Sequence, residues 1–153
     1  MPMKKNFIIL ILFLFLNPSV LAHIDHYKNL NKIEMEIFRN GKLIGYNYYF
    51  FNKKKEELII TNQIKFSVEI LGASIFKVEG YGEEKYIKDQ LISYESRTIQ
   101  NKKEKFVNLF YDKELNRFNI KGSSYTGKAS NENVIGNWWN HKILQVNSQI
   151  SPI

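Results

Sequence analysis

The chain has 153 residues with no cysteine, and its 22 lysines and arginines exceed its 15 aspartates and glutamates, which gives a formal net charge of +7. Because no disulfide can form, the fold depends on an apolar core. The length suits a single domain, and beyond the first 22 residues no apolar stretch approaches the roughly 20 residues of a transmembrane helix.

Residues 1–22 have the parts of an export signal. Lys4 and Lys5 form a charged start, FIILILFLFL over 7–16 forms the apolar stretch, and Ala22 provides a small residue for cleavage. An uncleaved membrane anchor is the alternative, but ten apolar residues span only about 15 Å as a helix. We expect cleavage near Ala22, a flexible N-terminus over 23–30, and a periplasmic or extracellular protein.

An exported protein is not expected to meet nucleic acid. The mature chain stays basic after Lys4 and Lys5 are removed, which favours anionic lipid headgroups, cell-wall polymers or acidic proteins as partners.

The first strand pair is predicted by Asn40-Gly41, which suits a two-residue type I′ turn. Such a turn pairs Met35 with Tyr46 and Ile33 with Tyr48. The register puts three aromatic side chains on the core side: Tyr46, Tyr48 and Phe50. Four other apolar side chains then form a patch on the outer side: Phe38, Leu43, Tyr49 and Phe51.

The next segment alternates over an unusual length. From Leu58 to Leu71 one face is apolar and is interrupted only by Asn62. At about 3.3 Å per residue this strand measures roughly 45 Å, so it should twist and curl.

Four more strands are predicted by alternation between turn residues, over 75–86, 90–101, 104–112 and 115–122. Gly80 and Gly82 share a face, where missing side chains permit a bend or leave room. The fold class is therefore all-β: a curled antiparallel meander of about seven strands, forming a half-barrel or incomplete barrel.

The last residues change in pattern. Ser130 or Asn131 is suited to cap a short helix, and apolar residues including Trp139 recur near helical spacing. We expect a short helical or irregular segment that covers the aromatic patch of the sheet and completes a single β domain over 31–153. The apolar end at Pro152-Ile153 leaves open that a final strand is missing.

Several stretches together resemble a known family. They are the hairpin FRNGKLIGYNYYFF, the strand pair IKFSVEILGASIFKVEGYGEEKY, the strand DQLISYESRT and the late NWWN. From Ile33 to Asn140 the chain resembles the uncharacterised bacterial family called domain of unknown function 6134. The resemblance implies a secreted all-β protein whose relatives tend to continue past the end of this chain. It implies no activity and carries over no catalytic or binding residue.

Groups suited to catalysis are few. His23, Asp25 and His26 are ligand types, but a flexible terminus is a poor metal site. His141 is either a base or, as we expect, a partly exposed polar residue. The adjacent carboxylates of Glu83-Glu84 and Glu56-Glu57 should diverge and be solvated. With no nucleophile, phosphate-loop or zinc motif, the sequence predicts no enzyme, metal or cofactor, although a carboxylate in a cleft would revive the enzyme alternative.

Lysines gather at one end of the predicted meander: Lys53, Lys54, Lys55, Lys88 and Lys113. They form either a rim that meets an anionic membrane or a set of solubilising charges, because carboxylates at the same end dilute them.

The aromatic load is the remaining signal. Its ordinary role is core packing. The sharper hypothesis is a non-enzymatic exported envelope protein that binds a lipid or another apolar or amphipathic ligand in the curled sheet. Its predicted ligand contacts are Tyr48, Phe50, Phe66, Tyr94 and Trp139, beside a roomy polar part formed by Gly80, Gly82, Ser96 and Thr98. The alternative is a structural or interaction module that docks an envelope protein, or a second copy, through Phe38, Leu43, Tyr49 and Phe51.

Overall fold

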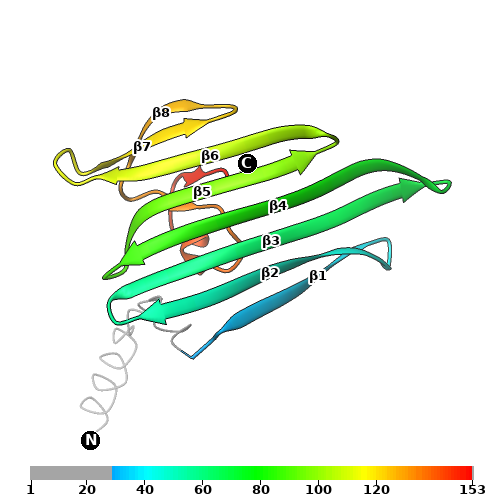
Figure 1. Ribbon diagram of the computed structural model, residues 1–153, viewed down its shortest axis with the longest axis horizontal. Helices are drawn as coiled ribbons and strands as arrows, with labels where there is room; N and C mark the ends of the chain where they lie inside the picture. The colour runs from blue at the N-terminus through cyan, green and yellow to red at the C-terminus, as the bar shows by residue number, and fades with distance from the viewer. Residues whose placement is uncertain (1–28, 153) are drawn as a thin grey trace, which may run out of the picture.

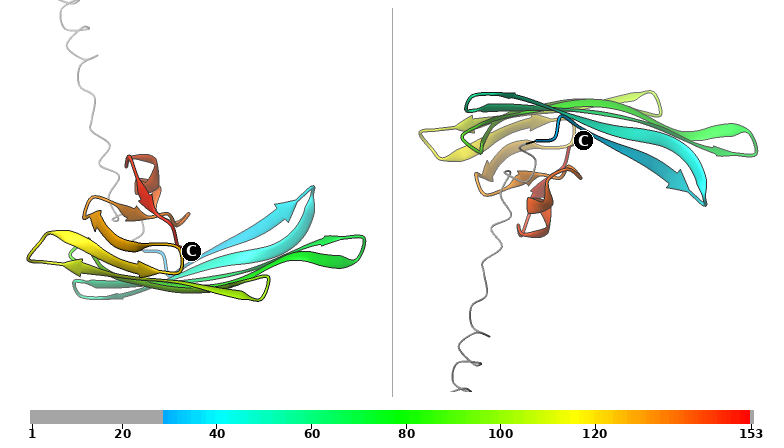
Figure 2. Two further views of the ribbon diagram at one scale, coloured as in Figure 1. Left: turned by 90° about the horizontal axis from the view of Figure 1, so that it is seen from above. Right: turned by 90° about the horizontal axis from the view of Figure 1, so that it is seen from below.

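The computed structural model of the chain describes residues 29–152. The export signal predicted over 1–22 and most of the N-terminus predicted over 23–30 lie outside these residues, as do His23, Asp25 and His26. The described part consists of one large antiparallel sheet and a C-terminal segment that lies against one of its faces (Figures 1 and 2). It contains no helix long and apolar enough to span a membrane.

The sheet is an eight-stranded meander in which each strand pairs with the next. Its strands are β1 (Lys32–Arg39), β2 (Lys42–Lys54), β3 (Glu57–Ile70), β4 (Ala73–Ile87), β5 (Gln90–Gln100), β6 (Lys103–Asp112), β7 (Arg117–Gly122) and β8 (Thr126–Ser130). The sheet curls but stays open, with β1 and β8 at its edges (Figure 2). The predicted all-β meander is confirmed. β8 was not predicted from the sequence, because its residues TGKAS include no large apolar side chain that could alternate with polar ones.

Two-residue turns join most of the long strands. The turns at Asn40-Gly41, Leu71-Gly72 and Asn101-Lys102 all have positive φ at both positions, as the mirror-image hairpin turns require. These three turns lie at the same end of the sheet, on the right in Figure 1, and we call it the tip end.

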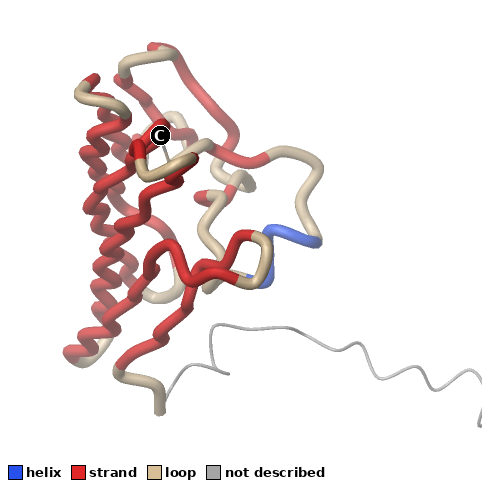
Figure 3. The backbone as a smooth tube through the Cα atoms, turned by 90° about the vertical axis from the view of Figure 1, so that its right-hand side faces the viewer, coloured by secondary structure: helices blue, strands red, loops and turns tan. Residues whose placement is uncertain are grey.

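The C-terminal segment (131–152) follows β8 and crosses the middle of the sheet on one side only (Figures 2 and 3). It contains β9 (Val134–Ile135), the 3₁₀ turn η2 (His141–Leu144) and β10 (Gln149–Ile150), which pairs parallel to β9. The predicted helix is therefore reduced to a single 3₁₀ turn in an otherwise irregular segment. We call the covered side of the sheet the inner face and the other side the outer face.

The core lies between the inner face and the C-terminal segment. Its most deeply buried large apolar side chains are Tyr49, Ile60, Leu109, Phe118, Ile135 and Trp139. The Trp139 ring meets the rings of Phe51 and Tyr86 edge-on, with centroid distances of 5.7 and 6.1 Å. Such pairs add about 0.5–1.5 kcal/mol each beyond the burial of area.

The predicted register of the first hairpin is wrong by one residue. A β-bulge between Ile37 and Phe38 pairs Met35 with Asn47 and Ile33 with Tyr49. One extra residue moves every later side chain to the opposite face. Gly45 permits the close packing at this point, since a Cβ there would lie 2.1 Å from the carbonyl oxygen of Lys65.

The bulge reverses the roles of the aromatic side chains of β2. Tyr49 and Phe51 are only 1% and 6% exposed and belong to the core. Tyr46, Tyr48 and Phe50, predicted for the core side, lie on the outer face instead. The run YNYYFFN thus has aromatic rings on both faces because the C-terminal segment covers one of them.

Candidate functional site

A buried carboxylate marks the centre of the inner face. Glu84 on β4 is 1% exposed, and no cation pairs with it among the described residues. Its oxygens accept hydrogen bonds from Tyr86 Oη (2.5 Å), Asn137 Nδ2 (2.5 Å) and Trp139 Nε1 (2.8 Å). Burial raises the pKa of Glu84, and the three hydrogen bonds oppose that rise only in part. Two of the three donors belong to the C-terminal segment, so Glu84 anchors that segment to the sheet.

A second anchor is formed by Tyr49. Its hydroxyl accepts hydrogen bonds from Asn47 Nδ2 (3.1 Å) and from the backbone N–H of Trp138 (3.3 Å). Asn62 Nδ2 in turn donates to Asn47 Oδ1 (2.5 Å). A chain of amides on β2 and β3 thereby fixes the tyrosine that holds the backbone before Trp139.

A third anchor holds the end of the segment. The carbonyl oxygen of Pro152 accepts hydrogen bonds from Tyr94 Oη (3.2 Å) and Ser96 Oγ (2.7 Å), both on β5. Burial raises the pKa of Tyr94, as it does those of Tyr49 and Tyr86, so these hydroxyls keep their protons at physiological pH.

Beside the anchors lies a hollow of about 240 Å³ on the inner face, which we call the inner hollow. One wall is apolar and consists of Ile64, Phe66, Phe76 and Val78; the other is polar and consists of Asn62, Ser96 and Thr98. Between the walls are Gly80 and Gly82, and Trp138 borders the hollow from the C-terminal segment. A Cβ at Gly80 would lie 2.9 Å from Thr98 Oγ1, so the neighbouring strand packs directly over this glycine.

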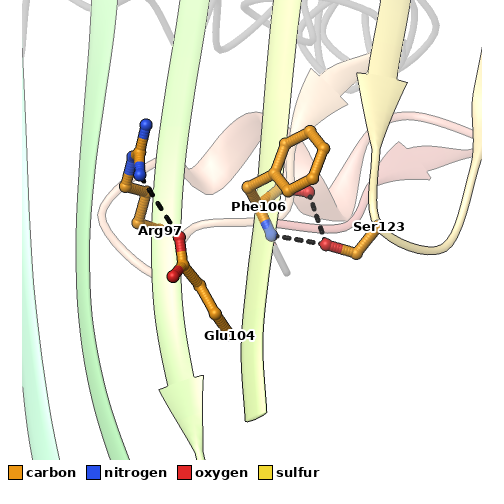
Figure 4. A network of polar contacts seen from close by, with 4 residues as sticks. All are labelled: Arg97, Glu104, Phe106 and Ser123. Carbon is orange, nitrogen blue, oxygen red and sulfur yellow. Dashed lines mark hydrogen bonds and ion pairs between the residues drawn. The ribbon is translucent and has the colours of Figure 1, made fainter.

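The outer face carries a broader and more open groove of about 800 Å³ across β2 to β5. Its apolar part includes Tyr46, Tyr48, Tyr81 and Ile99. Two of the three cations that line it pair with its two carboxylates, Lys65 with Glu79 (3.5 Å) and Arg97 with Glu104 (3.2 Å; Figure 4). The groove therefore carries charges of both signs that largely neutralise one another, as is usual for a sheet face exposed to water.

The structure divides the predicted ligand contacts between the two faces. Phe66 and Tyr94 line the inner hollow, whereas Tyr48 and Phe50 lie on the outer face, where Lys32 Nζ is 4.9 and 5.3 Å from their ring centres. Trp139 lies among the anchors and not at the hollow.

The predicted docking patch is divided as well. Phe38 and Leu43 are exposed near the turn of the first hairpin, whereas Tyr49 and Phe51 are buried beneath the C-terminal segment.

Sequence reasoning grouped four residues correctly on one face and missed the anchors. Gly80, Gly82, Ser96 and Thr98 lie together on the inner face as predicted. The prediction of a solvated Glu84 is wrong, and a signal for its burial was present, because strict alternation puts Glu84 on the same face as Val78 and Tyr86. Asn62 gave a similar signal as the single polar interruption of an apolar face.

No group of metal-ligating side chains is found within residues 29–152. The polar groups on the inner face are hydroxyls and amides around a carboxylate that is already engaged by three donors. This arrangement is suited to holding and orienting a molecule through hydrogen bonds and apolar contact.

A family model described as Domain of unknown function (DUF6134) matches residues 35–153. No curated protein and no solved structure gives a significant match.

Proposed function

The chain belongs to the family described as Domain of unknown function (DUF6134), a description that names no activity, and from the geometry we propose that it is a non-enzymatic binding protein for a small amphipathic molecule. The ligand is a lipid or a molecule of similar chemistry, and its apolar part occupies the inner hollow. Export to the cell envelope, indicated by the N-terminal sequence, belongs to the same proposal.

The observation that carries this proposal is the two-sided lining of the inner hollow. An apolar chain or ring fits against Phe66, Phe76 and Val78, while the hydroxyl of Thr98 and the side-chain oxygen of Asn62 line the space for a polar end. The amide nitrogen of Asn62 already donates to Asn47 and to the carbonyl oxygen of Tyr48. Ligand sites typically combine a mainly apolar wall with a few placed polar groups in this way.

The volume limits the ligand. About 240 Å³ corresponds to roughly eight water molecules at liquid density. A medium-length acyl chain or a single ring system therefore fits, and a larger lipid would extend past Trp138 into solvent.

The buried carboxylate supports binding over catalysis. Glu84 is engaged by three donors and does not line the inner hollow, so it is poorly placed to exchange a proton with a bound molecule. Its role in the proposal is to hold the C-terminal segment as one side of the site.

Native mass spectrometry of the exported protein, purified without detergent, tests the proposal. We expect an adduct that dissociates on activation and that is restored by adding decanoic acid to the stripped protein. A clean mass for the purified protein, together with no binding of decanoic acid or of a fluorescent amphiphile, would remove the proposal.

A further inference from the structure

The tip end of the sheet carries a cluster of exposed apolar side chains from two hairpins. Its members are Phe38, Leu43, Ile70, Leu71 and Ile75. Leu71 is fully exposed, at 102%, in a two-residue turn where its φ of 51° is a conformation that leucine rarely adopts. We propose that this end of the protein docks on an anionic lipid surface, with these side chains entering the headgroup layer.

The two hairpins present one continuous surface. Lys42 Nζ on the first hairpin lies 3.7 Å from Glu69 Oε2 on the second. Residues of both hairpins, including Leu43 and Ile70, line a shared depression of about 620 Å³. The apolar side chains therefore act together rather than as scattered surface residues.

The charges around the cluster favour an anionic partner. Five cations lie within three residues of the three turns: Arg39, Lys42, Lys102, Lys103 and Lys105. The two carboxylates in the same windows are both engaged, Glu69 by Lys42 and Glu104 by Arg97 (Figure 4). Four of the five cations form no ion pair within residues 29–152, so they are available to phosphate groups.

The opposite end of the sheet differs in its apolar content. Within three residues of its turns the exposed large apolar side chains are fewer: Ile87, Phe110 and Leu115. Two of its lysines pair with carboxylates, Lys88 with Glu56 (3.3 Å) and Lys85 with Glu57 (2.6 Å), and three further carboxylates lie near the same turns: Asp89, Asp112 and Glu114. The membrane contact considered from the sequence for that lysine-rich end is thus better supported at the tip end.

A second copy of the chain is a poorer occupant of this surface. Docking two tip ends against each other would bring four unpaired cations against four, and like charges at an interface are repulsive. A bilayer offers the complementary arrangement, because aliphatic side chains at turns enter the interface while lysine and arginine meet the phosphates above them.

Vesicle co-sedimentation of the full chain tests the proposal. We expect binding to vesicles of phosphatidylcholine and phosphatidylglycerol in equal parts, and weak binding to phosphatidylcholine alone. Leu71→Asn removes the apolar side chain and suits the positive φ, so it should leave the fold intact and lower partitioning about tenfold. Leu115→Asn, at an exposed turn of the opposite end, is the matched control and should bind normally.

A charge pair of variants separates electrostatic from apolar contributions. Lys102→Asn with Lys103→Gln should lower binding to the anionic vesicles roughly thirtyfold, because each surface cation contributes about 1 kcal/mol. Lys54→Gln with Lys55→Asn removes two lysines from the opposite end, where Lys55 also has a positive φ, and should change binding little. High salt should weaken the binding of the unmodified protein to the anionic vesicles, as Lys102→Asn with Lys103→Gln does.

Three results would overturn the proposal. They are equal losses in the tip-end variants and their controls, equal binding to both vesicle types, and a dimer in light scattering that Leu71→Asn abolishes, which would assign the surface to a second copy. The inner hollow is independent of these residues. Thr98→Val should therefore leave vesicle binding unchanged even where it weakens ligand binding, so the two proposals fail separately.

Discussion

The indole N–H of Trp139 donates a hydrogen bond of 2.8 Å to the carboxylate of Glu84, 55 positions earlier in the chain. Both residues are about 1% exposed. A polar contact therefore lies at the centre of the interface that holds the C-terminal segment on the sheet. Buried hydrogen bonds of this kind fix a single arrangement, because any displacement leaves several polar groups without partners.

Replacing Glu84 by alanine should destabilise the protein strongly. The change leaves three buried donors unsatisfied, and such losses amount to about 3 kcal/mol or more in the free energy of unfolding. Urea denaturation followed by circular dichroism measures the loss. Glu83→Ala is the control, because its side chain points to the outer face, and it should cost less than about 1 kcal/mol. Similar losses for the two variants would contradict the anchoring role of Glu84.

Glu84→Gln should change how stability depends on pH. Because burial raises the pKa of Glu84 above its ordinary value of 4.5, the folded state binds a proton there more tightly than the unfolded state. The proton-linked part of the contribution of Glu84 to stability is then fully present below about pH 4.5 and is lost as the pH rises through the folded-state pKa, whereas its hydrogen bonds remain. The free energy of unfolding of the unmodified protein, relative to Glu84→Gln, should fall between acid and neutral pH. A difference that grows with pH would show that the hydrogen bonds outweigh burial.

The two tryptophans should report different environments. Trp138 is 75% exposed, whereas Trp139 is buried against Phe51 and Tyr86. The fluorescence of Trp138→Phe, which retains Trp139, should be blue-shifted relative to that of Trp139→Phe. Trp139→Phe should also lower the free energy of unfolding by about 1.5–3 kcal/mol, since it removes a hydrogen bond to a charged group. Coincident spectra from the two variants would mean that the segment is detached in solution.

Thr98→Val tests the polar wall of the inner hollow. The substitution keeps the shape of the side chain and removes its hydroxyl, so the affinity for an amphiphile should fall by roughly tenfold. Thr61→Val, on the outer face of β3, is the matched control. Titration of a fluorescent amphiphile, with the emission of Trp138 as a second readout, measures both. Unchanged affinity in Thr98→Val would place the ligand elsewhere.

The fold class followed from the sequence because alternation and turn chemistry are local. Asn40-Gly41 predicted its turn correctly, yet the pairing a few residues away slipped by one. Tyr48 to Phe51 are aromatic at every position and offer no polar side to mark which face is exposed to water, so nothing local revealed the bulge beside Gly45. The segment predicted from Leu58 to Leu71, with one polar and one apolar side, was assigned to the correct faces as far as Ile70, whereas Leu71 lies in the following turn.

The anchors were less accessible to sequence reasoning. Strand alternation placed Glu84 on the inner face, but a buried carboxylate is expected only where hydrogen-bond donors are known to converge on it. Two of its three donors, Asn137 and Trp139, belong to an irregular segment whose path no periodicity describes. Contacts between the regular sheet and the irregular C-terminal segment depend on tertiary structure alone.

The order of elements along the chain has a consequence for biogenesis. The C-terminal segment (131–152) that shields the inner face comes after all eight strands of the sheet, so a chain emerging from the ribosome exposes the rings of Tyr49 and Phe51 to water until that segment follows. During that interval the incomplete chain has an uncovered apolar face, which favours association with other chains. Aggregation can therefore compete with folding until Trp139 packs against Phe51 and Tyr86 and covers the inner face.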